Sequence, residues 1–190
     1  MGGGRKALAP LAGRTLLDHV LERLEPQVGS IFLSVDAKSS ALDRFGLVQV
    51  PDPRPGSNGP LGGLAASIEH AAREGYRWLQ LVPCDAPLLP TNLTARLREH
   101  ASHNDVTVVV TRYAGRLQPV FSLWHVGIRV ENKRAVTEGG QAGFFEFLET
   151  HPYRVVDWPG QSADPFLNIN DHDALAAAER LVAREQEDAQ

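Results

Sequence analysis

The sequence predicts an α/β fold, with a mainly parallel sheet covered by helices on both faces. Short apolar runs alternate with amphipathic segments of roughly ten residues, the pattern of chains built from strand–helix–strand units. The chain has 190 residues, 43% hydrophobic and 22% charged, values that are ordinary for one globular domain. We therefore expect a single domain over residues 1–190, with a polar tail at about 185–190.

The first predicted element is a helix over residues 15–25. Thr15 and Asp18 have the spacing of a capping box, and apolar residues then recur at helical spacing until Pro26. The apolar run 31–35 predicts a buried strand, because runs without alternation are typical of strands covered on both faces. A weak helix over 39–45 and a strand over 47–50 complete this part.

The middle of the chain holds a loop and then repeats the alternation. Residues 51–63 contain four prolines and four glycines, which predicts a loop, with a helix from Leu64 to Gly75 after it. A strand over 78–82, a helix opening at Thr91 and a strand over 106–110 follow. Beyond residue 111 we expect a strand over 118–124, mostly helix over 125–150 with a break at 139–140, a strand over 153–157 and a helix over 171–184.

Composition excludes several classes of function. The formal charge of −4 arises in the last twenty residues, so there is no basic field to bind nucleic acid. No apolar run approaches the ~18 residues of a transmembrane helix, and the N-terminus lacks the apolar core of a signal peptide. Cys84 is the only cysteine, so an intramolecular disulfide is impossible, and we expect a cytoplasmic protein without a membrane partner.

Two aspartates follow predicted strands. Ligands of open parallel sheets bind beyond the carboxyl ends of the strands. Asp85 lies there between Pro83 and Pro87, as a carboxylate that holds Mg²⁺ together with substrate phosphates would, although a surface turn gives the same pattern. Asp52 follows the strand over 47–50, where it either joins such a site or initiates a turn before Pro53.

The glycine-rich loop before the predicted helix at 64 is a candidate phosphate or base site. Glycines allow close backbone approach, and a helix N-terminus favours negative charge. The candidate residues are Gly59, Pro60, Leu61, Gly62 and Gly63. Their spacing is neither that of the dinucleotide fingerprint nor that of a Walker loop, and a purely structural turn is the alternative.

Polar residues near both ends of the chain complete the candidates. Asn168 and Asn170 share one face of the alternating segment 166–170, where two amides could complete a metal or phosphate site. Asn170 is also placed to cap the last helix. Lys6 follows a glycine run and could reach phosphate as a compact charge, with a disordered terminus as the alternative.

Other reactive side chains have simpler interpretations. No histidine is close in sequence to Cys84, so we expect a buried inert thiol and not a nucleophile. His100 and His103 lack a third ligand for a metal. The large aromatic residues are expected in the core and not as stacking platforms: Trp78, Phe121 and Trp124.

Five segments, taken in order, resemble the molybdenum cofactor guanylyltransferase family. Residues 1–8 are similar to the end of that family's N-terminal signature, L-A-G-G-x-x-x-R-M-G-G-x-D-K-x-L. Gly59–Leu64 is similar to its G-P-L-A-G-L loop, and Pro83–Pro87 to its P-x-D-x-P metal motif. Gln118–Phe121 resembles its H/Q-P-x-F strand, and Phe166–Asn170 its F-x-N-I-N motif.

The resemblance implies a Rossmann-like three-layer α/β/α nucleotidyltransferase fold and a reaction. Mg²⁺-GTP and molybdenum-loaded molybdopterin would give the guanine dinucleotide cofactor and pyrophosphate, with molybdoenzymes or their chaperones as receivers. Asp85 would bind Mg²⁺ and Lys6 the phosphates, while Asp52 and the 59–63 loop hold the nucleotide. Asn168 and Asn170 would lie where the pterin phosphate meets the metal.

The sequence departs from the family pattern at two positions. Ser34 lies near the expected guanine position, where the family often has Asn, and Arg5 stands where the family usually has Asp. Two alternatives therefore stay open. One is the same chemistry on another substrate, by cytidylyl transfer to molybdopterin or nucleotidyl transfer to a sugar phosphate. The other is a non-catalytic relative that binds a nucleotide or cofactor and delivers it.

The family signature is entered midway, at its methionine. A doubly wound nucleotide-binding domain normally opens with a central strand that feeds the phosphate loop. We hypothesise that the native protein carries roughly 10–20 further residues before Met1, enough for one strand and a turn. A chain beginning at Met1 is then expected to be poorly stable and nearly inactive.

Overall fold

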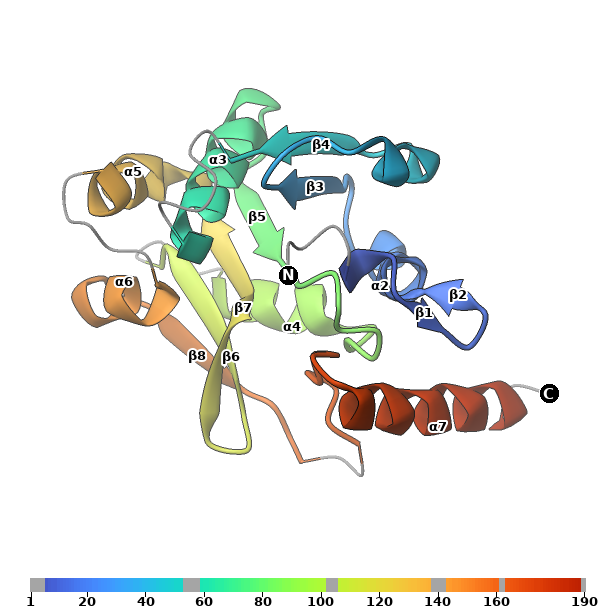
Figure 1. The fold of residues 1–190 in the computed structure, drawn as a ribbon. Coiled ribbons are helices and arrows are strands. Elements are labelled where there is room, and N and C mark those ends of the chain that lie inside the picture. The colour runs from blue at the N-terminus through green and yellow to red at the C-terminus, as the bar shows by residue number, and fades with distance from the viewer. Residues whose placement is uncertain (1–5, 53–58, 102–105, 138–142, 161–162, 189–190) are drawn as a thin grey trace.

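The computed structural model describes residues 6–52, 59–101, 106–137, 143–160 and 163–188 (Figure 1). Helices cover both faces of a central layer of strands, as the sequence predicts. The strands of this layer form two separate sheets and not one. Two strands form a small parallel sheet, and four form a larger mixed sheet. None of the helices in the described ranges is long and apolar enough to cross a membrane.

The N-terminal part contains a hairpin that the sequence analysis missed. Strands β1 (Pro10–Leu11) and β2 (Arg14–Thr15) pair antiparallel around a turn in which Ala12 and Gly13 have φ angles of 47° and 81°. Strands of two residues are too short to show any periodicity. The turn places Thr15 at the start of the next helix.

Helix α2 (Leu16–Leu24) begins with the predicted capping box. The hydroxyl oxygen of Thr15 accepts a hydrogen bond from the backbone N–H of Asp18, whose carboxylate accepts one from the backbone N–H of Thr15. The helix buries Leu16, Leu17, Val20, Leu21 and Leu24, and a 3₁₀ turn over Glu25–Gln27 ends it.

The small sheet consists of β3 (Phe32–Val35) and β4 (Val48–Pro51), which pair in parallel. The predicted weak helix between them is a 3₁₀ helix over Ser40–Phe45, and it ends at Gly46 in the left-handed conformation, with φ 65°. Helix α3 (Gly59–Arg73) follows β4 in the chain and contacts strands of both sheets.

Helix α3 (Gly59–Arg73) begins five residues earlier than predicted. The predicted loop over 59–63 is therefore wrong for this segment, since these residues form the first turn of the helix. Pro60 fits there because the first helical N–H groups have no partner in the helix. Residues 53–58 of the predicted loop lie outside the described ranges.

The large sheet has the order β5–β7–β6–β8, formed by Trp78–Leu81, Arg116–His125, Val108–Tyr113 and Arg154–Asp157. Strand β7 is antiparallel to both of its neighbours, and β6 and β8 are parallel. The hairpin between β6 and β7 turns at Ala114 and Gly115, both with positive φ.

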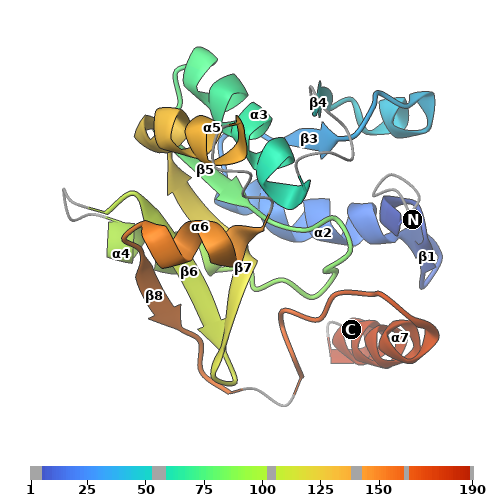
Figure 2. The same cartoon turned by 60° about the vertical axis from the view of Figure 1, so that its left-hand side comes forward.

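The two faces of the large sheet pack against different helices. Val109 and Phe121 contact α4 (Leu93–Ala101) on one face, and Val108 and Trp124 contact α3 on the other. The second face is also covered by α5 (Arg129–Thr137) and α6 (Phe144–Thr150). Figure 2 shows α3 and α5 side by side above this face. The expected core positions of Phe121 and Trp124 are thus confirmed, and Trp78 packs against the same core.

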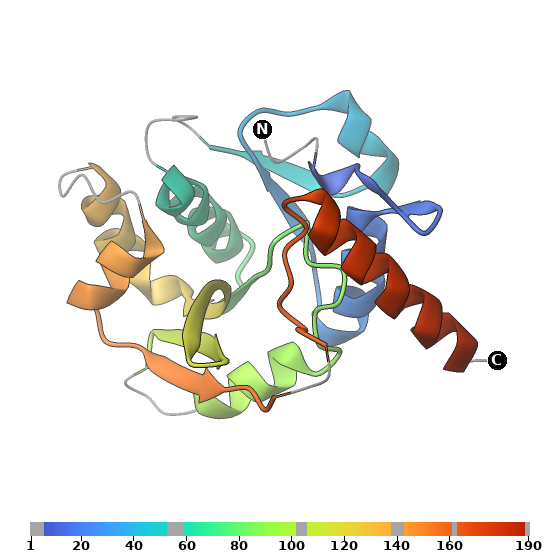
Figure 3. The same cartoon turned by 60° about the horizontal axis from the view of Figure 1, so that its bottom comes forward.

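The last helix, α7 (His172–Asp188), lies beside the N-terminal hairpin (Figure 3). Ala178 and Val182 pack there against Leu11 and Leu16. The predicted capping role of Asn170 is wrong. A carboxylate oxygen of Asp171 accepts the hydrogen bond from the backbone N–H of Ala174, at 2.8 Å, because the helix begins one residue later than expected.

Candidate active site

Asp85 lies beyond the carboxyl end of β5, as its sequence position predicts. Residues 83–87 turn there, and the backbone carbonyl of Asp85 accepts a hydrogen bond of 2.8 Å from the N–H of Ile169. This bond fixes segment 166–170 alongside the turn. Two parts of the chain that are 84 positions apart in sequence are thus brought together at one strand end.

Lys6, near the N-terminus, places its ammonium group beside Asp85 and segment 166–170. Its Nζ lies 3.5 Å from Oδ2 of Asp85 and donates a hydrogen bond to Oδ1 of Asn170. The side chain of Lys6 is 33% exposed and that of Asp85 is 13% exposed, so the pair lies at a rim that solvent reaches. Three predicted site residues from distant parts of the sequence therefore converge.

Asn168 contributes an unsatisfied buried oxygen to this segment. Its Oδ1 is buried and has no hydrogen-bond partner within the described part of the chain. Buried polar atoms without a partner are rare, and an unfilled ligand position is one reason for them. A carboxylate and amide oxygens are the hard donors that Mg²⁺ prefers. The residues around Asp85 therefore fit this ion.

Protein side chains alone would not enclose an ion here. The described ranges contain no group of three His, Cys, Asp or Glu residues that could hold a metal. An ion at Asp85 would take its remaining ligands from amides, water and substrate oxygens, which is the usual arrangement for Mg²⁺ bound with phosphates.

A second group of predicted residues lines a cavity of about 250 Å³ between the end of β3, the first turns of α3 and the end of β5. Ser34, Asp52 and Gly63 are part of its wall. Asp52 is buried, and its backbone N–H donates to the carbonyl of Val35 at 2.8 Å. A Cβ atom added at Gly63 would lie 3.1 Å from Oγ of Ser34, so the helix approaches this strand as closely as glycine allows.

The first turn of α3 borders this cavity. Pro60 and Gly63 belong to the wall, and the helix N-terminus offers backbone N–H groups to an anion. Gly62 lies in the same turn, and Gly59 is the first residue of the helix. The side chain of Leu61 is fully buried in the core, so this residue can contribute to a ligand site through its backbone only.

Asp36 lines the same cavity and was missed in the sequence analysis. It follows β3 directly, so the rule that singled out Asp52 and Asp85 at strand ends would also have found it. Its exposed carboxylate lies at the edge of the wall that Ser34 and Asp52 form.

Cys84 has the environment of an inert thiol. Burial raises the pKa of this thiol to about 11, and the negative charge of Asp85 adds to the shift. The thiolate is the nucleophilic form and this pKa disfavours it, so Cys84 fits a partly buried packing residue. The ring of His100 contacts the carbonyl of Arg96 within its own helix, while His103 lies outside the described ranges.

Together these features define a nucleotidyltransferase. A layered α/β domain holds a lysine and a carboxylate at one strand end, beside a cavity at a helix N-terminus. The family model of the MobA-like NTP transferase domain matches residues 1–154. The chain belongs to this family.

A named relative agrees with that class, and two solved structures share the fold. A protein of Rhodopseudomonas palustris (strain HaA2), named molybdenum cofactor guanylyltransferase, is 37% identical over 97% of this chain and 87% of its own. The crystal structure of molybdopterin-guanine dinucleotide biosynthesis protein A from Archaeoglobus fulgidus is similar with a TM-score of 0.73 and 20% identity, covering 94% of this chain and 91% of that one. A Mycobacterium tuberculosis protein in complex with manganese has a TM-score of 0.67 at 17% identity and covers 94% of each chain.

Proposed function

We propose that this protein transfers GMP from GTP to molybdenum-loaded molybdopterin, forming the guanine dinucleotide cofactor and releasing pyrophosphate. The observation that carries the proposal is the convergence of Lys6, Asp85 and Asn170 at one strand end. The name of the 37% identical relative, molybdenum cofactor guanylyltransferase, supports the choice of guanylyl transfer.

The reaction needs positioning and charge neutralisation more than covalent work. An oxygen of the terminal phosphate of molybdopterin attacks the α-phosphorus of GTP. One phosphorus–oxygen bond forms, the bond to the β-phosphate oxygen breaks, and the electron pair leaves with pyrophosphate. The nucleophile is already an anion, so the step needs no general-base histidine.

Each residue at the rim has a role in this scheme. Asp85 would hold Mg²⁺, with the amide oxygens of Asn168 and Asn170 on the side of the pterin phosphate. When bound, the ion would supply charge neutralisation at the reacting phosphates. Lys6 would contact phosphate as a point charge. Its present bonds to Asp85 and Asn170 show that its ammonium group reaches this point.

The cavity beside the rim would receive the nucleoside. Ser34, Asp36 and Asp52 offer polar groups there, and the first turn of α3, at Gly59–Gly63, offers backbone N–H groups. A serine hydroxyl selects a base less strictly than an asparagine amide. Its single oxygen both donates and accepts, whereas an amide holds a separate donor nitrogen and acceptor oxygen in a fixed arrangement. Cytidylyl transfer to molybdopterin therefore remains the closest alternative.

Two further alternatives belong to other substrates or to another class of function. Transfer to a sugar phosphate would use the same rim with a different acceptor. A non-catalytic relative would bind the nucleotide or cofactor and deliver it to a molybdoenzyme or its chaperone. We place the activity in the cytoplasm, which suits a chain with a single cysteine.

A single-turnover assay separates these functions. Purified protein in Mg²⁺ buffer is mixed with molybdenum-loaded molybdopterin and either GTP or CTP, and released pyrophosphate is measured. Our proposal predicts release with GTP, little with CTP and none without molybdopterin. Equal or faster release with CTP would favour the cytidylyl alternative, and tight nucleotide binding without release would favour the delivery protein.

A further inference from the structure

The ammonium group of Lys6 covers two of the three side-chain oxygens at the rim that fit Mg²⁺. Its Nζ lies 3.5 Å from Oδ2 of Asp85 and donates a hydrogen bond to Oδ1 of Asn170. The third oxygen, Oδ1 of Asn168, is buried and has no hydrogen-bond partner within the described ranges. The cluster therefore already holds a cation, and it keeps one acceptor unused.

The backbone around Lys6 is anchored, so a change of partner falls to its side chain. The carbonyl of Lys6 accepts a hydrogen bond of 3.0 Å from the N–H of Ala9, and Ala7 belongs to a buried cluster with Leu17 and Leu42. The side chain of Lys6 itself is 33% exposed. Its flexible stem of four carbons allows the ammonium to exchange one partner for another while the backbone stays in place.

An ammonium group and a divalent ion exclude each other at this carboxylate. Mg²⁺ binds oxygen at about 2.1 Å, so an ion on Asp85 would be an immediate neighbour of Nζ of Lys6. The two positive charges repel each other, and solvent screens them poorly because the side chain of Asp85 is only 13% exposed. The described ranges contain no group of three His, Cys, Asp or Glu residues whose charges would offset this repulsion.

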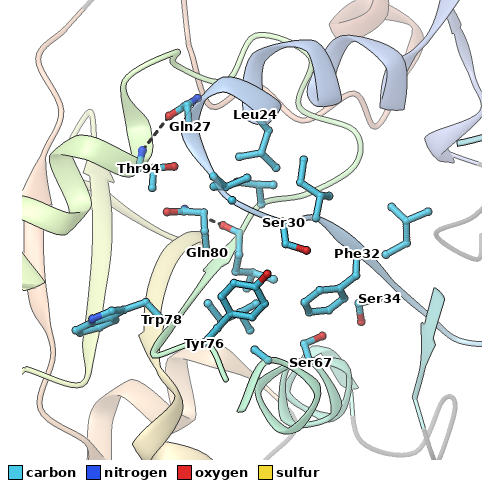
Figure 4. A pocket seen from close by; sticks show the side chains of 18 of the residues that line it. Leu24, Gln27, Ser30, Phe32, Ser34, Ser67, Tyr76, Trp78, Gln80 and Thr94 are labelled. Carbon is cyan, nitrogen blue, oxygen red and sulfur yellow. Dashed lines mark hydrogen bonds between the residues drawn. The ribbon is translucent and has the colours of Figure 1, made fainter. Parts of the chain in front are cut away.

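The cavity between the two sheets offers a displaced ammonium no nearby anion. This cavity, of about 720 Å³, reaches the turn before Asp85 at Pro83 and Cys84. The side chains that Figure 4 labels on its wall are uncharged. Among the described residues that line it, Glu74 is the one acid. Glu74 precedes β5 whereas Asp85 follows it, so the length of the strand, about 13 Å, separates the two acids.

A nucleotide changes this balance because it brings its own anions. The oxygens of a triphosphate bind both a lysine ammonium and Mg²⁺. Lys6 would move onto phosphate and uncover the oxygens of Asp85 and Asn170. These oxygens would then be open to an ion that the phosphates share.

We propose that Lys6 is a placeholder for Mg²⁺: its ammonium group keeps the ion from binding alone, and the phosphates of a nucleotide draw the ammonium away and admit the ion. The identity of the nucleotide rests on the proposed function, whereas the exchange of one cation for the other does not. Metal and nucleotide therefore bind together, and the metal does not bind first.

Mn²⁺ without nucleotide tests the placeholder, because electron paramagnetic resonance measures the free ion during a titration of the full chain. Lys6→Met should raise the affinity for Mn²⁺ about 10- to 100-fold, since one nearby charge changes the binding of a proton by a similar factor. Lys6→Arg keeps the charge and should bind Mn²⁺ like the parent. Lys38→Met removes the charge of an exposed lysine outside the cluster and should also leave the affinity unchanged.

A double variant, Lys6→Met with Asp85→Asn, shows where the gained affinity arises, and it should lose that gain. Equal Mn²⁺ affinity of the parent and Lys6→Met would overturn the proposal. An equal gain from Lys6→Arg or Lys38→Met, or a gain that survives in the double variant, would overturn it as well. The pyrophosphate assay fails separately. A chain that gains Mn²⁺ affinity with Lys6→Met but releases no pyrophosphate would contradict the proposed function and leave the placeholder standing.

Discussion

The two sheets of this domain contain similar strands in different surroundings. Val108, Val109 and Val110 of β6 have neighbours on both edges and helices on both faces, and all three are fully buried. The similarly apolar β3 has one neighbouring strand within the described ranges and is only partly covered. The comparison teaches that burial depends on neighbouring strands as much as on the apolar pattern. It also separates two regions. The large sheet is the packed half, which stabilises the fold, and the gap between the two sheets is the seam, with the candidate chemistry of Lys6, Asp85 and Asn170 at its rim.

The largest expected effect tests the chemistry at the seam. Asp85→Asn should lower the rate of guanylyl transfer by about 10³-fold, which corresponds to ~4 kcal/mol, because an amide is a poor substitute for a carboxylate ligand. Since the side chain lies at a solvent-reached rim, the melting temperature should change little. Near-normal turnover in Mg²⁺ would end the metal assignment, and a large drop in melting temperature would indicate a structural role.

The next effect tests the packed half against the seam. Phe121→Ala removes a fully buried ring from the large sheet and should cost about 3–5 kcal/mol of unfolding free energy. Phe32→Ala, in the half-buried β3, should cost less than half as much. Urea unfolding of both variants measures the difference. Equal losses would show that β3 is as well packed as β7 and would contradict the comparison.

Two consecutive residues, Asn170 at the rim and Asp171 at the start of α7, should separate activity from stability. Asn170→Ala removes the hydrogen-bond acceptor that holds Lys6 and should slow turnover about tenfold, roughly 1.4 kcal/mol, with little effect on melting. Asp171→Ala removes the cap of α7 and should cost about 1 kcal/mol of stability without loss of turnover. The reverse pattern would mean that the two roles are interchanged.

Asn168→Ala should slow turnover more than Asn170→Ala does. The side-chain oxygen of Asn168 is buried without a partner, so its unused capacity is available to a ligand. Removing it leaves no protein group unpaired, and the melting temperature should therefore stay within a few degrees of the parent. A fall in stability without a change in rate would show that Asn168 is a packing residue.

The smallest effect concerns the capping box of α2. Burial alone would raise the pKa of Asp18, but hydrogen bonds from Thr15 and Arg44 and the charge of Arg44 outweigh it and lower this pKa from 3.8. The ionised carboxylate therefore stabilises the fold above pH 3.8, and this contribution is lost as the pH falls through the lowered value. Thr15→Ala should cost about 1 kcal/mol at pH 7 and less in acid, as measured by unfolding at both pH values. A cost that is the same in acid would contradict the role of the Asp18 charge.

The elements that the sequence predicts well are those with local signals. The capping box of Thr15 and Asp18 predicts the start of α2, and the helical spacing of its apolar residues predicts its buried face. The rule that ligands gather at strand ends selects Asp52 and Asp85, and the structure places Asp52 in the wall of a cavity and Asp85 beside Lys6 at the rim. The convergence of Lys6 with Asp85 could not be read from the residues alone, since nothing local relates positions 6 and 85.

The misplaced features depend on tertiary structure. Apolar periodicity carries no information on strand direction, so the antiparallel placement of β7 and the division into two sheets were not predictable from it. Glycine and proline in residues 59–63 favour a loop by composition, yet packing of Leu61 and Leu64 into the core makes them the first turn of α3. Asn170 and Asp171 are both good caps, and a shift of one residue decides between them.

The fate of the α-phosphate of GTP tests the account most directly. The chain is incubated with molybdenum-loaded molybdopterin and GTP labelled at either the α- or the γ-phosphate. We predict that the α-label enters the pterin product and the γ-label leaves as pyrophosphate. Absence of α-label from the product would contradict guanylyl transfer, and transfer of the γ-label would show attack at a different phosphorus.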